Sequence, residues 1–175
     1  MGRTNMRYAR KQAGYTLIEL LLYVAIVGVL LSAVTAFFGV TTDARIKNQT
    51  VNEVNTQGTF AMDYITQTIR NATSVTSPAA AATDSQLTLV VPTGTLSPTV
   101  FNLSSGVLQV KEGTATAIAL TNSKVQVTNL TVKNLTRSGT SGTVQVSITV
   151  SRVNTANDAD YDYTRTFTTT AAIRP

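Results

Sequence analysis

The sequence predicts an α+β protein in which a long N-terminal hydrophobic helix packs on a domain of antiparallel β-sheet. Three observations predict this arrangement. Residues 15–40 form an almost uninterrupted apolar run, and residues 41–72 continue it with apolar side chains at helical spacing. From residue 86 onward, short segments rich in Val, Thr and Leu alternate with turn residues. One long helix followed by several strands favours a helix layer on a sheet layer.

The first 14 residues form a basic leader. Of the 14 Lys and Arg residues in the chain, four stand in this segment, and no acidic residue accompanies them: Arg3, Arg7, Arg10 and Lys11. Removal of residues 1–14 leaves 10 basic and 9 acidic residues and lowers the formal net charge from +5 to +1. A nearly neutral mature chain argues against DNA as a partner, because non-specific DNA binding depends on positive charge.

The apolar run of residues 15–40 can cross a lipid bilayer as a helix. At about 1.5 Å per residue it spans about 39 Å, whereas the hydrocarbon core is about 30 Å thick. The basic residues before it place the N-terminus in the cytoplasm. We therefore expect a single-pass membrane protein with an extracytoplasmic C-terminal domain. A secretory signal peptide would be shorter and would end in a small-residue cleavage site, while a plain signal anchor remains an alternative.

Glu19 is the only charged side chain of this run. A carboxylate inside a bilayer costs about 2–3 kcal/mol on insertion scales, so such a residue marks a function or a partner. An ammonium group brought to it in a medium of low dielectric constant would neutralise it, whereas either charge alone would be expensive there.

The segment Lys11–Leu20, KQAGYTLIEL, resembles the leader junction of type IV pilins and pseudopilins. The resemblance implies that a prepilin peptidase cuts between Gly14 and Tyr15 and that the new amino group of Tyr15 is N-methylated. It also implies that Thr16, Leu17 and Glu19 belong to the assembly motif, with Glu19 meeting the N-terminal amine of a neighbouring subunit. The implied partners are other pilin or pseudopilin subunits and an inner-membrane assembly platform, and the product is a cell-surface or periplasmic filament.

Two departures from the family pattern bear on the subtype. Tyr15 stands where Phe is usual, and Ala36 or its neighbours stand where many major pilins have a helix-breaking Pro. The second departure favours a minor pilin or a pseudopilin over a major pilin. The order of segments after the helix is similar to that of minor pseudopilins of the J type.

The chain beyond the apolar run should form the rest of the helix and then a connection. Residues 41–72 predict an amphipathic second half of the same helix, although a separate helix after a break near residues 39–42 is an alternative. Residues 73–85 lose the helical pattern and contain Pro78, which predicts a loop.

Residues 86–175 predict an extracytoplasmic β-rich domain. The clearest alternation lies in residues 143–153, where Val144, Val146, Ile148 and Val150 point to one face. The expected strands are residues 87–91, 99–103, 107–111, 124–135, 143–153 and 161–173.

An acidic loop near the C-terminus is a candidate calcium site. Asp158, Asp160 and Asp162 alternate as in the first half of a calcium-binding loop, whose carboxylates converge on a hard cation. The loop lacks Gly at Tyr163 and an acid at Thr169, so a solvated acidic turn is the alternative. No other cofactor is expected.

The composition argues against an enzyme. The chain has no Cys, His or Trp, which removes thiolate and imidazole nucleophiles and the commonest general base. The favoured function is a structural subunit of a type IV pilus or a type II secretion-like filament. The alternatives are a membrane-anchored binding or adhesion module that does not polymerise, and a subunit of a DNA-uptake pilus.

Overall fold

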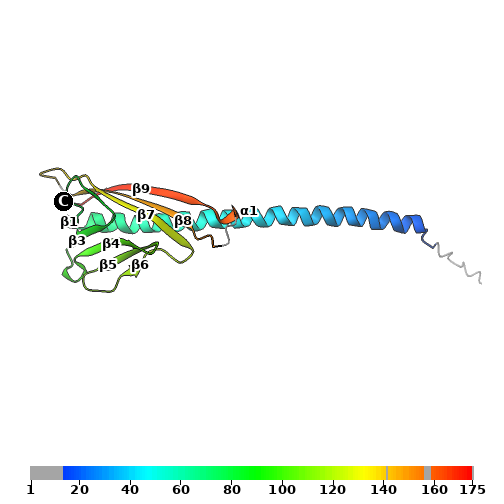
Figure 1. The fold of residues 1–175 in the computed structure, drawn as a ribbon, viewed down its shortest axis with the longest axis horizontal. Coiled ribbons are helices and arrows are strands. Elements are labelled where there is room, and N and C mark those ends of the chain that lie inside the picture. Colours follow the sequence, from blue (N-terminus) through cyan, green and yellow to red (C-terminus); the bar gives the residue numbers. More distant parts are fainter. Residues whose placement is uncertain (1–13, 141, 156–158, 175) are drawn as a thin grey trace, which may run out of the picture. The chain divides into compact units, whose positions relative to one another are not determined.

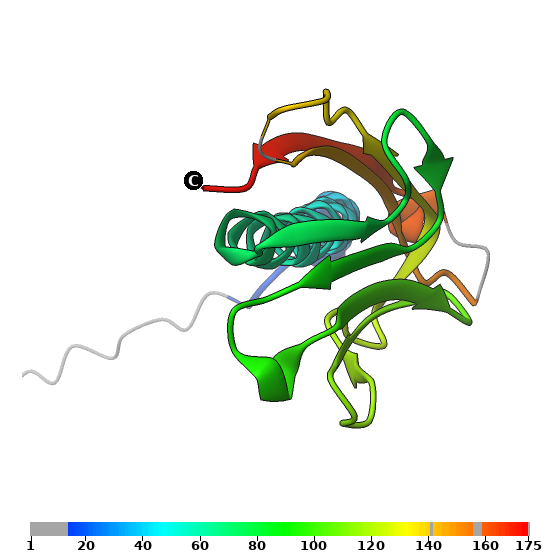
Figure 2. The same ribbon diagram turned by 90° about the vertical axis from the view of Figure 1, so that its left-hand side faces the viewer.

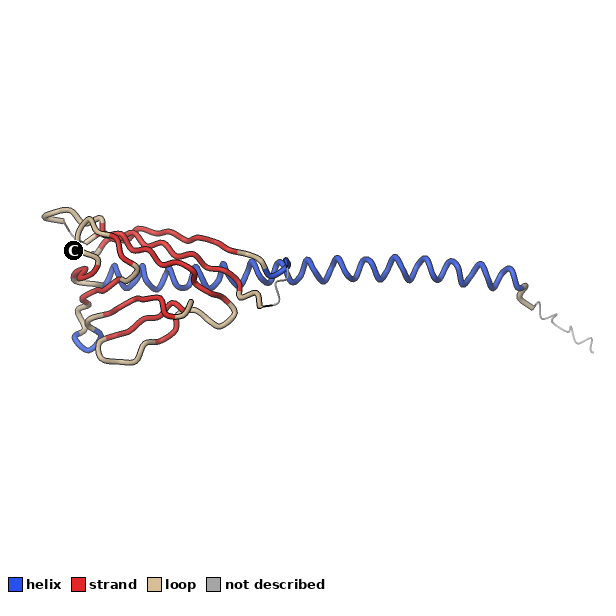
Figure 3. Tube along the Cα trace, viewed as in Figure 1, coloured by secondary structure: helices blue, strands red, loops and turns tan. Residues whose placement is uncertain are grey.

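The computed structural model describes residues 14–140, 142–155 and 159–174, apart from the side chains of Val40, Asp43 and Asp160. The chain divides into two compact units, residues 1–42 and 43–175. Helix α1, Leu17–Asn71, begins in the first unit and ends in the second as one element of 55 residues. Figures 1 and 3 show that it has no break near residues 39–42.

The second half of α1 is amphipathic and buries one stripe of side chains. Val54, Ala61, Ile65 and Ile69 are fully buried and recur at the spacing of one helix face. Arg70 stands in the last turn, where a positive charge is favourable at the negative end of the helix dipole. This half of α1 therefore owes its stability mainly to packing inside the C-terminal unit.

A five-stranded antiparallel sheet in the order β1-β3-β4-β5-β6 forms one side of the C-terminal unit. A short 3₁₀ helix, η1 (Gly94–Leu96), connects β3 to β4. The strands are β1 (Ser74–Ser77), β3 (Leu87–Val90), β4 (Thr99–Ser104), β5 (Val107–Glu112) and β6 (Ile118–Ala119).

A four-stranded antiparallel sheet in the order β2-β7-β8-β9 forms the other side. The central pair runs in register from Val125 opposite Arg152 to Asn134 opposite Val144, with a bulge between Val127 and Asn129. A second 3₁₀ helix, η2 (Ala159–Tyr161), precedes the last strand. The strands are β2 (Thr83–Asp84), β7 (Val125–Asn134), β8 (Thr143–Arg152) and β9 (Thr164–Ala172).

The helix and both sheets share one hydrophobic core. Side chains from α1, from β3 to β5 and from β7 to β9 belong to a single cluster of buried residues. Figure 2 shows the helix between the red β9 on one side and the green strands of the five-stranded sheet on the other. Phe101 on β4 is the largest fully buried side chain, and Tyr64 of α1 meets its ring edge-on at 6.1 Å between centroids. Removing apolar surface of this kind from water stabilises the unit by about 25 cal/mol per Å².

Two glycines are required by their surroundings. Ser105 and Gly106 both have positive φ and form the two-residue turn between β4 and β5, the geometry of a type I′ hairpin. Gly58 of α1 faces the ring of Phe167 on β9, and a Cβ atom at this position would overlap the ring. The hairpin register and the close approach of β9 to the helix therefore depend on these residues.

The structure confirms the predicted α+β class, with a long N-terminal helix and antiparallel sheet. It differs from the sequence prediction in detail. Residues 73–85, expected to be a loop, contain β1 and β2, because each segment pairs with a strand remote in sequence. The strand expected at residues 161–173 begins at Thr164, since residues 159–161 form η2. The strands also form two sheets rather than one.

Candidate processing and assembly site

The predicted cleavage point lies immediately before α1. Gly14, Tyr15 and Thr16 have no regular secondary structure, and all three residues are exposed. Tyr15 exposes 78% of its surface, and no atom lies within 4 Å of the position that a Cβ would take at Gly14. A protease can bind an exposed, non-helical peptide without first unfolding a helix, so the geometry is compatible with cleavage between Gly14 and Tyr15.

Thr16 caps the N-terminus of α1. Its hydroxyl accepts a hydrogen bond from the backbone N–H of Glu19 at 3.3 Å, and its carbonyl accepts one from the N–H of Leu20 at 3.2 Å. These are the bonds of an N-cap residue, with Glu19 at the third helical position. The Thr-Leu-Ile-Glu motif thus defines where the helix begins, and it leaves Tyr15 outside.

The Glu19 carboxylate belongs to a small cluster on one face of α1. Tyr23, one turn further along, donates its hydroxyl to Glu19 Oε1 at a long distance of 3.5 Å. The Tyr23 ring also meets the Tyr15 ring edge-on, with centroids 6.4 Å apart. Glu19 and Tyr23 are four residues apart on the helix, so they lie on one side of it, and the ring contact places Tyr15 beside Tyr23. The predicted N-terminal residue and the predicted assembly acid are therefore neighbours within one chain.

The apolar segment beyond this cluster has a lipid-compatible surface. An 18-residue window of α1 has a mean hydropathy of 2.6, and none of it is buried within the chain. By length and composition the helix can cross a membrane. The exposed large apolar side chains include Leu20, Ile26, Leu30 and Phe37.

The polar side chains of the apolar segment make hydrogen bonds within the helix itself. Ser32 donates its hydroxyl to the carbonyl of Val29, and Thr35 donates to the carbonyl of Leu31, both at 2.8 Å. Glu19 and Tyr23 bond each other, as described above. In a medium without water, bonds of this kind lower the cost of burying the polar groups.

This arrangement can support two kinds of chemistry. The exposed backbone before Leu17 can be hydrolysed, and cleavage there would create an α-amino group at Tyr15. The Glu19 carboxylate, partly shielded and four residues further along the chain, can then bind an ammonium group by a charge-assisted hydrogen bond. A neighbouring helix could reach the same carboxylate, because this face of α1 is exposed.

The predicted calcium ligands lie mostly outside the described residues. Asp158 and the side chain of Asp160 are not described, whereas Asp162 is exposed. Lys47 of α1 donates its ammonium group to the backbone carbonyls of Ala159 and Asp162, at 3.2 and 3.3 Å. Within the described ranges, no group of three or more acidic side chains is placed to hold a metal ion. Calcium binding stays a prediction, which calorimetric titration at millimolar calcium would test.

Two features of the candidate assembly site were not predicted from the sequence. The capping role of Thr16 could have been found, because Thr followed three residues later by Glu is a known signature of a helix N-terminus. The contact between Tyr23 and Glu19 could have been suspected from their separation of four residues on a helix.

Comparison with known protein families finds a match in the N-terminal segment that contains Gly14, Tyr15 and Glu19. Residues 9–35 match the family model described as the prokaryotic N-terminal methylation motif. No curated protein and no solved structure matches the chain. The matched residues include the basic end of the leader, the Gly14–Tyr15 junction and Glu19, and the match supports a type IV pilin-type protein. Together with the apolar helix, it suggests a membrane-anchored protein with a C-terminal domain.

Proposed function

We propose that this chain is a minor pilin or a pseudopilin, a structural subunit of a type IV pilus or a type II secretion-like filament. A prepilin peptidase removes residues 1–14 on the cytoplasmic side of the membrane, and the amino group of Tyr15 is then methylated. The processed subunit waits in the membrane until it enters a filament. Packing of apolar helices drives polymerisation, and Glu19 sets the stagger between neighbouring subunits.

The match of residues 9–35 to the methylation motif is the observation that carries this proposal. The structure adds physical support. The junction at Gly14 is exposed and non-helical, and α1 starts with a capped turn two residues after Tyr15. The apolar side chains of residues 17–38 are exposed, so they require lipid or other helices to cover them. A filament core made of such helices would cover them when the subunit leaves the bilayer.

The proposal is tested by the intact mass and N-terminal sequence of the protein from membranes with and without an active prepilin peptidase. We expect a peptidase-dependent start at methylated Tyr15. Replacing Gly14 with Val should block cleavage, because a branched side chain restricts the backbone at the scissile bond. Replacing Gly28 with Ala provides the matched control, since that glycine lies inside the helix and has open space around it.

A chain that keeps its leader in the presence of active peptidase would contradict the proposal. It would favour a membrane-anchored extracytoplasmic binding module. It would also contradict the role proposed for Glu19, because no amino group would be created at Tyr15. A DNA-uptake role would instead require retention of the processed protein on DNA with a marked dependence on salt concentration.

A further inference from the structure

One outer strand of the four-stranded sheet is long and unprotected. Strand β9 stands at the end of the order β2-β7-β8-β9, has nine residues and pairs with β8 without a register shift. Figure 1 shows it in red as the outermost strand of this sheet. It contains no Pro or Gly. Its one charged side chain, Arg165, is turned toward α1, where it donates a hydrogen bond to Oδ1 of Asn55 at 2.7 Å.

The other outer strands among the described residues are protected against the addition of a further strand. Strands β2 and β6 have only two residues each. Strand β1 has four residues and an irregular register between Val75 and Ser77, and Pro78 follows it. Short edge strands, irregularities and Pro are the means by which natural proteins keep sheet edges from pairing. The contrast indicates that the edge of β9 is left open for a partner.

The hydrogen bonds at the two ends of β9 show which of its backbone groups face outward. The carbonyl of Tyr163 accepts a bond from the N–H of Arg152, and the N–H of Ile173 donates to the carbonyl of Gly142. Because bonded pairs alternate along an antiparallel ladder, the odd-numbered residues bond β8 and the even-numbered residues point their N–H and C=O groups away from it. Within the described part of the chain, no other helix or strand bonds these outward groups. The outward residues are Thr164, Thr166, Thr168, Thr170 and Ala172.

A groove of about 330 Å³ follows this edge between β9 and α1. It is lined by Phe167 and Thr169, whose side chains share the face that packs on α1, and also by Thr166 and Thr168, whose side chains lie on the opposite face. A groove that touches both faces of a strand must run along its edge. Met62 lines the α1 side of the groove. The space therefore lies where an added strand would have to lie.

We propose that β9 binds an extended segment of another polypeptide, which joins the four-stranded sheet as an antiparallel fifth strand. The outward backbone groups of Thr166, Thr168 and Thr170 supply six hydrogen-bonding positions. In binding of this kind, the backbone bonds provide affinity and the alternate side chains provide specificity. The antiparallel direction is the more stable one for each residue paired.

The two faces of β9 define the chemistry of the partner. Side chains of the added strand that point into the groove would contact Met62 and Phe167, so they should be apolar. The opposite face carries a row of hydroxyl groups, in which Thr168 bonds Ser147 at 3.0 Å. Thr166 bonds the next hydroxyl of β8 in the same way. The remaining side chains of the partner should therefore be polar, which gives a segment of alternating apolar and polar residues.

The direction of β9 argues against a second copy of this chain as the partner. Only β9 of another copy is long enough to match this edge. Strand β9 runs in the same direction as α1, because Asn55 bonds Arg165 and, further along both elements, the carbonyl of Arg70 accepts a bond from the N–H of Arg174. An antiparallel pair of β9 strands would thus orient two α1 helices oppositely, whereas subunits of one filament pack their helices in one direction. This step rests on the proposed function.

The test measures amide hydrogen exchange by NMR in the full-length protein in detergent. Without a partner, the outward amides of Thr166, Thr168 and Thr170 should exchange quickly. The amides of Phe167 and Thr169, which bond β8, should exchange slowly and serve as the internal reference. The probe is a capped synthetic peptide in which Thr and Val alternate between two terminal Lys residues. At about ten times its dissociation constant, it should slow the three outward amides about tenfold, because they exchange only in the unbound protein.

Methylated peptides show whether backbone hydrogen bonds carry the binding. In an antiparallel pair, the peptide N–H groups that face β9 belong to the residues whose side chains share the polar face, which are the Thr residues. Methyl groups on the Thr nitrogens should abolish the protection, whereas methyl groups on the Val nitrogens should not. Equal protection by both methylated peptides would overturn the proposal.

A substitution in β9 tests the same edge from the side of the protein. Thr168→Pro removes one outward N–H and places a ring in the path of the added strand, without removing a bond to β8. It should abolish the peptide's effect at Thr166 and Thr170 and change the melting temperature little. Thr168→Val keeps the N–H and should bind the peptide as the wild type does. If the Pro variant does not fold, the methylated peptides still decide the question.

Three results with the unmodified protein would contradict the proposal. Slow exchange of the outward amides in dilute protein without peptide would mean that another part of the chain covers the edge. Exchange that slows as the protein concentration rises would mean that copies of this chain pair with each other. The third result is the absence of a selective effect of the peptide up to its solubility limit. Because none of these measurements depends on leader cleavage, their failure is distinct from failure of the proposed function.

Discussion

At the scale of single residues, Thr16 caps the N-terminus of α1 and so helps to determine where this helix starts. Thr16→Ala removes the hydroxyl that caps the N–H of Glu19 and should cost the first turn about 1 kcal/mol. We expect the amide of Glu19 to exchange with solvent about fivefold faster, measured by hydrogen exchange in detergent. Thr16→Ser keeps a capping hydroxyl and should exchange as the wild type does. Equal exchange in all three proteins would contradict the capping role.

The role proposed for Glu19 is a different one and concerns a neighbouring subunit. Because the Glu19 carboxylate is proposed to meet the amine of another chain, Glu19→Ala should leave cleavage and membrane insertion intact but reduce incorporation into filaments. Immunoblots of membranes and of sheared filaments would measure both. Tyr23→Phe, which removes only the hydroxyl bonded to Glu19, serves as the comparison and should affect incorporation far less. Normal incorporation of Glu19→Ala would refute the assigned role.

Ionisation of Tyr64 should make the free energy of unfolding depend on pH in the alkaline range. Burial raises its pKa above the ordinary value of 10.0, and the hydrogen bond to the Glu112 carboxylate at 3.0 Å raises it further. Above pH 10 the unfolded chain therefore loses the phenolic proton before the folded chain does, and the free energy of unfolding falls as the pH rises. This stability is fully present below pH 10 and is lost as the pH approaches the folded-state pKa. In urea melts, Tyr64→Phe should lose less stability than the wild type between pH 9 and 11.

At the scale of elements, Gly58 lets β9 approach the helix. Gly58→Val would push the ring of Phe167 away and should destabilise the C-terminal unit by about 1–3 kcal/mol, as overpacking does. Thermal or urea unfolding would measure the change. Combining it with Phe167→Ala should recover part of the loss, because the overlapping ring is removed. Gly39→Val is the control, since nothing lies within 4 Å of a Cβ at that position.

Elements with a strong local pattern can be predicted from the sequence, and elements held by remote partners cannot. The apolar stripe of α1 and the alternation in β8 are local periodicities, so the sequence predicts both elements at nearly their observed bounds. Strand β1 has the sequence Ser-Val-Thr-Ser and no hydrophobic alternation, and it is a strand because it pairs with β3. The division into two sheets follows from such pairings, which no single segment specifies.

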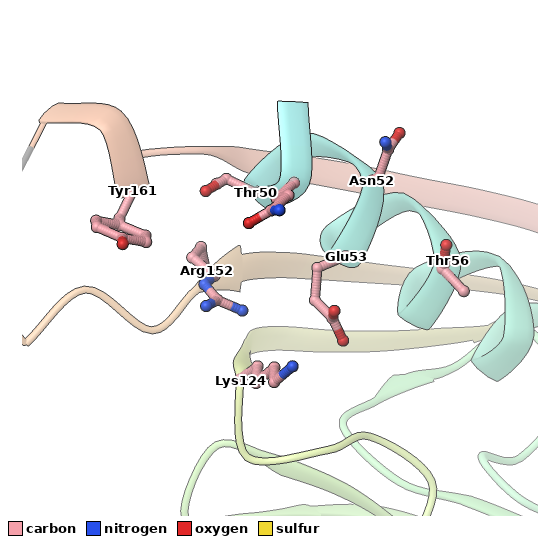
Figure 4. A pocket seen from close by; sticks show the side chains of 8 residues that line it. Thr50, Asn52, Glu53, Thr56, Lys124, Arg152 and Tyr161 are labelled. Atoms are coloured by element: carbon pink, nitrogen blue, oxygen red, sulfur yellow. The ribbon is translucent and has the colours of Figure 1, made fainter. Parts of the chain in front are cut away.

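Whether a group of residues can be recognised from the sequence also depends on whether its members are close together in the chain. Gly14, Tyr15 and Glu19 lie within six residues of each other, so a short sequence motif is enough to identify them. The cavity around Arg152 brings together residues 50, 124 and 152, which only the folded chain places side by side. None of these residues stands in a recognisable motif, so the sequence alone does not reveal this cavity (Figure 4).

At the scale of the whole molecule, the core and the apolar surface occupy different units. Among the described residues, every buried core side chain lies at or beyond Val54, whereas most exposed large apolar side chains lie between Tyr15 and Phe38. A fragment of residues 43–175 should therefore be soluble without detergent and should unfold cooperatively. Size-exclusion chromatography and circular dichroism would check this. The full chain should require detergent, and a fragment that aggregates or lacks a cooperative transition would contradict the expectation.

The position of α1 inside the C-terminal unit has a mechanical consequence. The chain leaves the helix only at Asn71, after the whole buried stripe from Val54 to Ile69 has passed between the two sheets. A tensile load applied along the helix from its N-terminal end would thus act in shear on this stripe, and many side-chain contacts would have to yield together. We therefore expect the unit to resist pulling along the helix axis better than prying across it.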